Sequence, residues 1–156
     1  GERTNLVSDI HIFVSATGGW TEDLRLTWSP TGADLAYDDP GISGEWSIKI
    51  IPVDNISETS HHFRGKQPDW SPLRDEIAFV RDDDIWLLSL DTREELLLVD
   101  DPVAAEWPSW SPDGERLVFV STRDGNAELY LINRDGSGLE RLTNNSTWDR
   151  FPTWCP

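Results

Sequence analysis

The 156-residue sequence contains no methionine, one cysteine and only three histidines. A single cysteine excludes a disulfide within the chain and the paired Cys and His ligands that hold structural zinc. His61 and His62 are adjacent, so in a strand they would point to opposite faces. The H-E-x-x-H motif is absent. We therefore expect no metal site and no cofactor, and two readings of Cys155 stay open: a small residue tolerated in a turn, or an intermolecular disulfide.

Long apolar segments are also missing. The longest run, Leu96 to Val99, has four residues, whereas a membrane-spanning helix needs about 20. No window shows a sustained apolar period of 3.6 residues, so we expect almost no helix. The chain begins at Gly1-Glu2-Arg3 without a charged and then apolar leader. The sequence therefore predicts no membrane insertion.

Basic residues are few: 13 Lys and Arg stand against 29 Asp and Glu, a net charge of -16. A surface this acidic repels phosphate backbones and anionic headgroups, so we expect neither a nucleic-acid nor a membrane partner. The densest acidic group is Asp82-Asp83-Asp84. Three consecutive carboxylates on an extended chain cannot all face one ion, and no D-x-D-x-D-G loop is present. An acidic turn is favoured there over a calcium site.

Tryptophan, by contrast, is abundant, with nine residues, and four of them recur at a nearly fixed spacing. Trp28, Trp70, Trp110 and Trp154 are separated by 42, 40 and 44 residues, and each begins Trp-Ser-Pro or, at the last, Trp-Cys-Pro. Ser-Pro followed by Asp or Gly favours a tight turn. A repeat of this length with several short strands is typical of a propeller blade.

Each repeat has the same interior. A short apolar strand follows the turn, as in "ERLVFVS" after Trp110; a polar turn then leads to a second strand, "AELYLINR", and a third stretch, "LERLTNN", returns to the next tryptophan. β-branched and aromatic residues suit these strands, while Gly and Pro separate them. The sequence predicts an all-β fold, a β-propeller of four-stranded antiparallel blades, with each Trp-Ser-Pro at the end of a first strand. Trp28, Trp70 and Trp110 are predicted to be buried between blades.

The pattern P-x-W-S-P-D-G, followed by an apolar strand and "ELYLINRDGSGLERLT", resembles the TolB-like family of β-propeller repeats. The resemblance is closest over 107–143 and looser in the two earlier repeats. This family's repeat also occurs in propeller domains attached to some serine peptidases. The resemblance implies a periplasmic or extracellular location and a role with protein partners.

The repeat divides the chain into three whole blades and two partial ones. The predicted boundaries are 1–25 (partial), 26–67, 68–105, 106–150 and 151–156 (partial). The two partial blades are complementary, because residues 5–17 read as late strands and 151–156 as a first strand. They could pair within one chain, pair between chains, or belong to a longer protein. Since closed symmetry removes free strand edges, we predict a homodimer that completes one ring of about seven or eight blades.

Catalytic motifs are absent from the sequence. Gly41-Ile42-Ser43-Gly44 and Gly136-Ser137-Gly138 both fail the G-x-S-x-G spacing, and no phosphate-binding glycine pattern occurs. We therefore expect no catalytic residue and no enzymatic activity. The alternative is an accessory propeller of a serine peptidase or other hydrolase whose catalytic domain lies outside this chain. A sugar-binding or lyase-like propeller is a third possibility, and it would need a polar central pocket.

In a propeller, the loops between the second and third strands of each blade lie on the same face as the loops that lead to the next blade. We predict a binding surface on this face. Trp and Arg, which dominate binding hot spots, occur in these loops beside acidic residues. Packing between blades is an equal alternative for the two tryptophans. The predicted residues for a protein or peptide partner are Trp20, Arg81, Asp82, Arg123, Asp124, Trp148 and Arg150.

Overall fold

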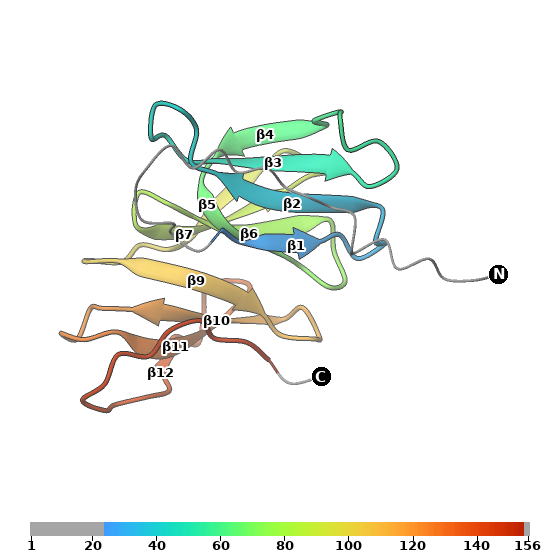
Figure 1. Ribbon diagram of the computed structural model, residues 1–156. Coiled ribbons are helices and arrows are strands. Elements are labelled where there is room, and N and C mark those ends of the chain that lie inside the picture. The colour runs from blue at the N-terminus through green and yellow to red at the C-terminus, as the bar shows by residue number, and fades with distance from the viewer. Residues whose placement is uncertain (1–23, 155–156) are drawn as a thin grey trace, which may run out of the picture.

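The computed structural model describes residues 24–154, and in this range twelve strands form three four-stranded antiparallel sheets (Figure 1). The first sheet contains β1 (Leu26–Trp28), β2 (Asp34–Asp39), β3 (Ser47–Pro52) and β4 (His61–Arg64). The second contains β5 (Lys66–Trp70), β6 (Glu76–Arg81), β7 (Asp84–Ser89) and β8 (Glu95–Val99). The third contains β9 (Ala105–Trp110), β10 (Arg116–Ser121), β11 (Glu128–Asn133) and β12 (Glu140–Arg141). The predicted all-β fold of four-stranded antiparallel blades is confirmed.

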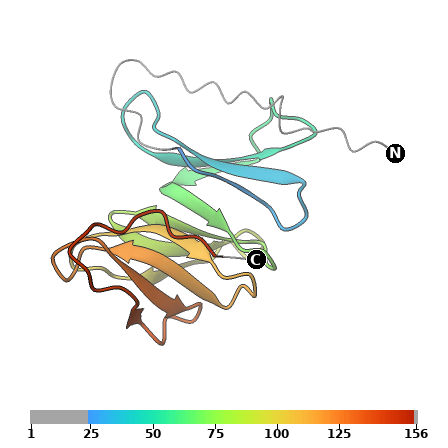
Figure 2. The ribbon, with the colours of Figure 1, turned by 60° about the horizontal axis from the view of Figure 1, so that its bottom comes forward.

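The strands of each sheet follow one another in chain order, so every connection within a blade is a hairpin. The sheets lie face to face, with β5 and β9 next to the preceding blade (Figures 1 and 2). Residues 24–154 contain no helix long and apolar enough to cross a bilayer.

The Trp-Ser-Pro segments end the first strand of each sheet, as predicted. After Trp110, the Ser111 N–H donates to the carbonyl of Arg116 at 2.9 Å, and the Gly114 N–H donates to the Ser111 carbonyl at 2.8 Å. Gly114 has φ of 65°, a conformation that favours glycine. The same serine bond recurs at Ser29 and Ser71, so one hairpin design closes the first two strands of all three blades.

Two apolar clusters hold the blades together, and each contains a tryptophan from a Trp-Ser-Pro segment. Trp70 packs with Ile48 and Ile50 of the first sheet, and Trp110 packs with Ile85 and Leu87 of the second. Both indoles are only 5% exposed. The prediction of burial between blades is correct for Trp70 and Trp110.

The burial prediction is wrong for Trp28, whose side chain is 38% exposed. The repeat explains the difference, because each of these tryptophans packs on the blade that precedes it in the chain. No blade precedes the first sheet in the part of the chain that the structure describes. Leu24 and Leu26 are exposed there too, so this end of the stack presents an apolar surface.

Hydrogen bonds to the backbone fix the spacing between blades. The Trp70 N–H donates to Oγ1 of Thr27 at 3.1 Å, and the Trp110 N–H donates to Oδ2 of Asp69 at 2.7 Å. Thr27 and Asp69 each stand directly before a motif tryptophan. The indole Nε1 of Trp110 also donates to the carbonyl of Asp69, at 3.1 Å. The contact between one blade and the next is therefore itself a repeating unit.

Trp154 continues this repeat beyond the third sheet. Its Nε1 donates to the carbonyl of Ser109 at 3.0 Å, as that of Trp110 does to Asp69, and the Arg116 guanidinium lies 5.4 Å from the centre of its ring. The segment that ends at Trp154 thus packs on the third sheet as the first strand of a following blade would.

A buried ion pair ties the loop after β8 to the end of β10. The Asp101 side chain is fully buried and accepts hydrogen bonds from Ser121 Oγ at 2.6 Å and from Arg123 at 2.6 and 3.1 Å. Burial by itself raises the pKa of the Asp101 carboxyl. The hydrogen bonds from Ser121 and Arg123, and a further one from the Val103 N–H, outweigh the effect of burial. The pKa of Asp101 is therefore lowered overall.

We expect this pair to make the fold sensitive to acid. Because the pKa of Asp101 is lower in the folded state, its contribution is present above the ordinary value of 3.8 and is lost as the pH falls through the folded pKa. Asp101→Asn should reduce the free energy of unfolding by about 2–3 kcal/mol at neutral pH, as expected for lost hydrogen bonds to a charged group, and by less in acid. Urea titrations at both pH values measure this.

The control is Glu115→Gln, which removes a more exposed ion pair with Arg74. Exposed pairs contribute about 0–1 kcal/mol, so this variant should stay close to the wild type. An Asp101→Asn protein that loses no more stability than Glu115→Gln would contradict the account.

Candidate functional site

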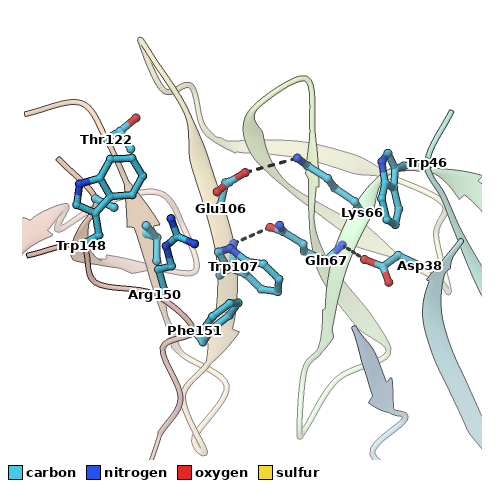
Figure 3. Close-up of a pocket in the computed structure, with 12 residues that line it drawn as sticks. Asp38, Trp46, Lys66, Gln67, Glu106, Trp107, Thr122, Trp148, Arg150 and Phe151 are labelled. Atoms are coloured by element: carbon cyan, nitrogen blue, oxygen red, sulfur yellow. Dashed lines mark hydrogen bonds and ion pairs between the residues drawn. The ribbon is translucent and has the colours of Figure 1, made fainter. Parts of the chain in front are cut away.

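A cleft of about 290 Å³ opens on the face where the first strands of the blades begin (Figure 3). It is lined by residues of all three blades and is closed on one side by the segment after β12. The walls combine aromatic rings with charged groups. The lining residues are Asp38, Trp46, Lys66, Gln67, Glu106, Trp107, Val120, Thr122, Ala127, Trp148, Arg150 and Phe151.

Three residues at the cleft have an uncommon backbone conformation. Gln67, Trp107 and Phe151 have φ values of 54°, 55° and 53°, and each stands directly before a proline. A non-glycine residue in this region is strained by roughly 1–3 kcal/mol, and such strain clusters at functional sites. In β5 and β9 the residue coincides with a break in strand register. The first strands therefore bulge at the cleft.

The bulges are joined by hydrogen bonds that run from blade to blade. The Gln67 N–H donates to Oδ2 of Asp38 at 2.8 Å, and the Trp107 N–H donates to Oε1 of Gln67, also at 2.8 Å. The other oxygen of Asp38 accepts from the Arg25 N–H at 2.7 Å. Burial raises the pKa of the Asp38 carboxyl, against the opposing effect of these two N–H groups. These bonds hold the base of the cleft in one geometry.

Aromatic rings form much of the wall. Trp107 and Phe151 meet edge to face, with ring centres 4.6 Å apart, and Phe151 is half exposed. Trp148 is 64% exposed, and the Arg150 guanidinium lies 5.2 Å from the centre of its ring. At the mouth, Lys66 Nζ lies 3.5 Å from Glu106 Oε1 and connects the second and third blades (Figure 3). Such a surface suits an extended ligand with both apolar and polar groups.

The structure brings two of the seven predicted partner-binding residues together, because Trp148 and Arg150 both line the cleft. Arg81 and Asp82 line a second hollow of about 230 Å³ between the first and second blades. Trp46 and Lys66 border both hollows. The two hollows therefore form one continuous face of the propeller.

Most of the other predicted residues already have partners within the protein. Arg81 makes two hydrogen bonds to Glu95, at 2.9 and 2.7 Å, and lies 4.1 Å from the ring centre of Trp86. Asp82 pairs with Arg64, and Arg123 holds the buried Asp101.

Asp124 accepts hydrogen bonds from the Tyr130 hydroxyl and from Arg141. Burial, followed by the Asp124 carboxylate, raises the pKa of Tyr130 to about 12. Trp20 lies outside the described residues. Among residues 24–154 no group of three His, Cys, Asp or Glu side chains is placed to hold a metal ion.

Sequence reasoning did not identify Gln67, Trp107 or Phe151 as site residues. The signal is in the sequence, since each stands three positions before a motif tryptophan and directly before a proline. Trp46, Lys66 and Glu106 carry no such signal. They reach the cleft from different blades, so only the fold shows that they are neighbours.

Three stacked four-stranded blades, with a cleft where the first strands begin, give this chain the fold of β-propeller blades. A family model described as "TolB beta propeller domain" matches residues 61–156. The chain belongs to this family.

Two of the similar proteins come from Agrobacterium. The chain is 28% identical over 139 residues to an uncharacterized protein of Agrobacterium fabrum. The aligned region covers 82% of this chain and 46% of that protein. It superposes on the structure of putative TolB from Agrobacterium tumefaciens with a TM-score of 0.71 and 26% identity, over 86% of this chain and 51% of the other. Tricorn protease homolog 1 of Streptomyces coelicolor is 36% identical over 73 residues, 47% of this chain and 7% of that protein. The chain spans about half the length of the two Agrobacterium proteins.

Proposed function

We propose that this chain is a non-catalytic binding module that holds an extended segment of a protein or peptide partner in the cleft described above. The observation that carries the proposal is the strained and hydrogen-bonded base of that cleft, which presents Trp107, Trp148 and Phe151 beside charged groups. Rigid aromatic side chains supply contact area at low entropic cost, and they are common among residues that dominate binding energy.

Family membership supports the same role and a periplasmic or extracellular location, as the resemblance to TolB-like proteins implies. The proposal includes no catalytic step, no cofactor, and neither nucleic acid nor membrane as a partner. The net charge of -16 is consistent with the last two points.

The proposal is tested with peptides selected from a random displayed library on the wild-type protein. Trp148→Ala should weaken their binding at least tenfold, because the ring is a wall of the cleft. The melting temperature should hardly change, since the side chain is mostly exposed. Isothermal titration calorimetry and thermal melts measure the two effects.

Leu139→Ala is the matched control. Leu139 is also an exposed apolar residue, but it lies in the turn between β11 and β12, outside the cleft. Peptides that bind Trp148→Ala as tightly as the wild type, or a library that yields no binder, would refute the proposal.

We also propose that two copies of the chain close one ring. Trp28 exposes an apolar surface at one end of the stack, while at the other end Trp154 begins to cover the third sheet. A second copy would bury both ends through the contact that already joins the blades. Two copies would also supply about the length of chain found in the Agrobacterium relatives.

A second candidate function is an accessory propeller of a hydrolase, which the similarity to tricorn protease homolog 1 favours. In that case the cleft would receive segments of a substrate protein on their way to a separate catalytic domain. The full gene distinguishes the two functions. A serine hydrolase region with a G-x-S-x-G motif encoded in the same reading frame would favour the accessory role.

A further inference from the structure

We infer that the cleft recognises a carboxylate group of its partner, and that the Arg150 guanidinium binds it beside the aromatic wall. The inference rests on the proposed function, because it names the chemistry that the same cleft selects.

The first observation is the pairing of the basic residues. Nine of the twelve Lys and Arg side chains in residues 24–154 form an ion pair with Asp or Glu. Arg93, Arg116 and Arg150 have no such partner among the described residues. Of these three, only Arg150 lines the cleft. Arg150 is therefore the one basic residue of the cleft that forms no ion pair within residues 24–154.

The second observation is that the acidic groups of the cleft are already satisfied. Both oxygens of Asp38 accept backbone N–H groups, at 2.7 and 2.8 Å. Glu106 pairs with Lys66. Within residues 24–154 the cleft therefore has an available cation and no comparably available anion, which is the charge complement of an acidic ligand group.

The position of Arg150 suits this role. Its guanidinium lies 5.2 Å from the ring centre of Trp148, and its side chain extends between Trp148 and Trp107 in the view of Figure 3. A guanidinium on an aromatic face keeps the N–H groups at its edge available, and these match the two oxygens of a carboxylate.

A second donor lies at the base of the cleft. Gln67 uses Oε1 to accept the Trp107 N–H, so its amide orientation is fixed and its NH₂ group has no acceptor among residues 24–154. Gln67 is held by the Asp38 bond and lines the same cleft. Its NH₂ group can donate to an oxygen of the bound segment.

The overall charge disfavours a ligand with many negative charges. At a net charge of -16 the whole molecule repels polyanions, so one arginine does not make this face a phosphate or nucleic-acid site. An Asp or Glu side chain and the C-terminus of a partner both carry the required group. An adjacent aromatic or aliphatic side chain would pack on Trp107 and Phe151.

Small probes test the inference directly. N-acetyl-phenylalanine carries a terminal carboxylate, and N-acetyl-aspartyl-phenylalaninamide carries a side-chain carboxylate. Their uncharged counterparts are N-acetyl-phenylalaninamide and the corresponding asparaginyl peptide. Each is titrated into the wild type, Arg150→Gln and Arg93→Gln, and binding is followed by the chemical shifts of the tryptophan indole N–H groups.

On the wild type and on Arg93→Gln, at least one carboxylate probe should bind about tenfold more tightly than its uncharged counterpart. Arg150→Gln should bring this ratio close to one. A preference for N-acetyl-phenylalanine would identify the recognised group as the C-terminus of a partner. A preference for N-acetyl-aspartyl-phenylalaninamide would identify it as an acidic side chain. Arg93→Gln is the control because Arg93 also has no carboxylate partner among the described residues but lies outside the cleft.

The outcomes separate this inference from the proposed function. Equal binding of charged and uncharged probes in the cleft would overturn the carboxylate inference alone. A preference that survives in Arg150→Gln would overturn it too. No binding of any probe, together with no selected peptide from the displayed library, would contradict both.

Discussion

Trp110→Ala is expected to lower the free energy of unfolding by about 3–5 kcal/mol, the range found for large buried aromatic side chains. The indole is 5% exposed and lies in the cluster that joins the second and third blades. Truncation would leave a cavity against Ile85 and Leu87 and would remove the hydrogen bond from Nε1 to the carbonyl of Asp69. Chemical denaturation measures the loss, and the melting temperature should fall by roughly 10 °C.

Trp148→Ala is the control, because it removes the same side chain from an exposed position and should cost less than about 1 kcal/mol. Trp110→Phe should fall between the two, since it keeps part of the packing and loses the Nε1 bond. If Trp110→Ala unfolded at the same denaturant concentration as Trp148→Ala, the motif tryptophan would not join the blades as described.

The second large effect concerns assembly. At micromolar concentration the chain is expected to form a homodimer of about twice 17.7 kDa. Trp28→Asp should convert it to a monomer, because a charge at this site cannot be buried against a second copy without a partner. Light scattering after size-exclusion chromatography measures both masses. Ile42→Asp, which introduces the same charge at a fully exposed position of the β2–β3 loop, should leave the dimer intact.

A wild-type protein that is monodisperse near 17.7 kDa would reject the homodimer. A Trp28→Asp dimer would show that the exposed end of the first sheet is not the interface. In either case the stack of three blades described above would be unaffected.

Much of the fold could be predicted from the sequence because the repeat is local. The turn after each motif tryptophan depends on neighbouring Ser, Pro and Gly residues, and the alternation of apolar residues marks the strands around it. The repeat also predicts equal environments for Trp28, Trp70 and Trp110. Trp28 differs because burial depends on a neighbouring blade, which a local pattern cannot supply.

The site was less predictable for the same reason. Loop position and residue type predict Trp148 and Arg150 as binding residues, and both line the cleft. The same features predict Arg123, yet Arg123 holds the buried carboxylate of Asp101. Loop position and residue type do not distinguish a binding arginine from a structural one. The distinction depends on whether a carboxylate from another strand lies within reach.

The bulged residues illustrate what an aligned repeat can add. Gln67 and Trp107 occupy equivalent positions before a proline, and their positive φ values make the N–H groups available to the preceding blade. When the repeats are aligned on their motif tryptophans, Phe151 falls at the same alignment position as Gln67 and Trp107. The sequence signal for the base of the cleft is therefore a residue that stands three positions before a motif tryptophan and directly before a proline.

The central claim is that the cleft lined by all three blades binds a protein segment. The most direct measurement is a map of indole and backbone N–H chemical shifts on addition of a peptide selected on the wild-type protein. The account predicts the largest changes at Trp107, Trp148, Arg150 and Phe151, with little change in the turns at the opposite end of the blades. Saturable binding with its largest changes at those opposite turns, such as 71–75 and 111–115, would contradict it.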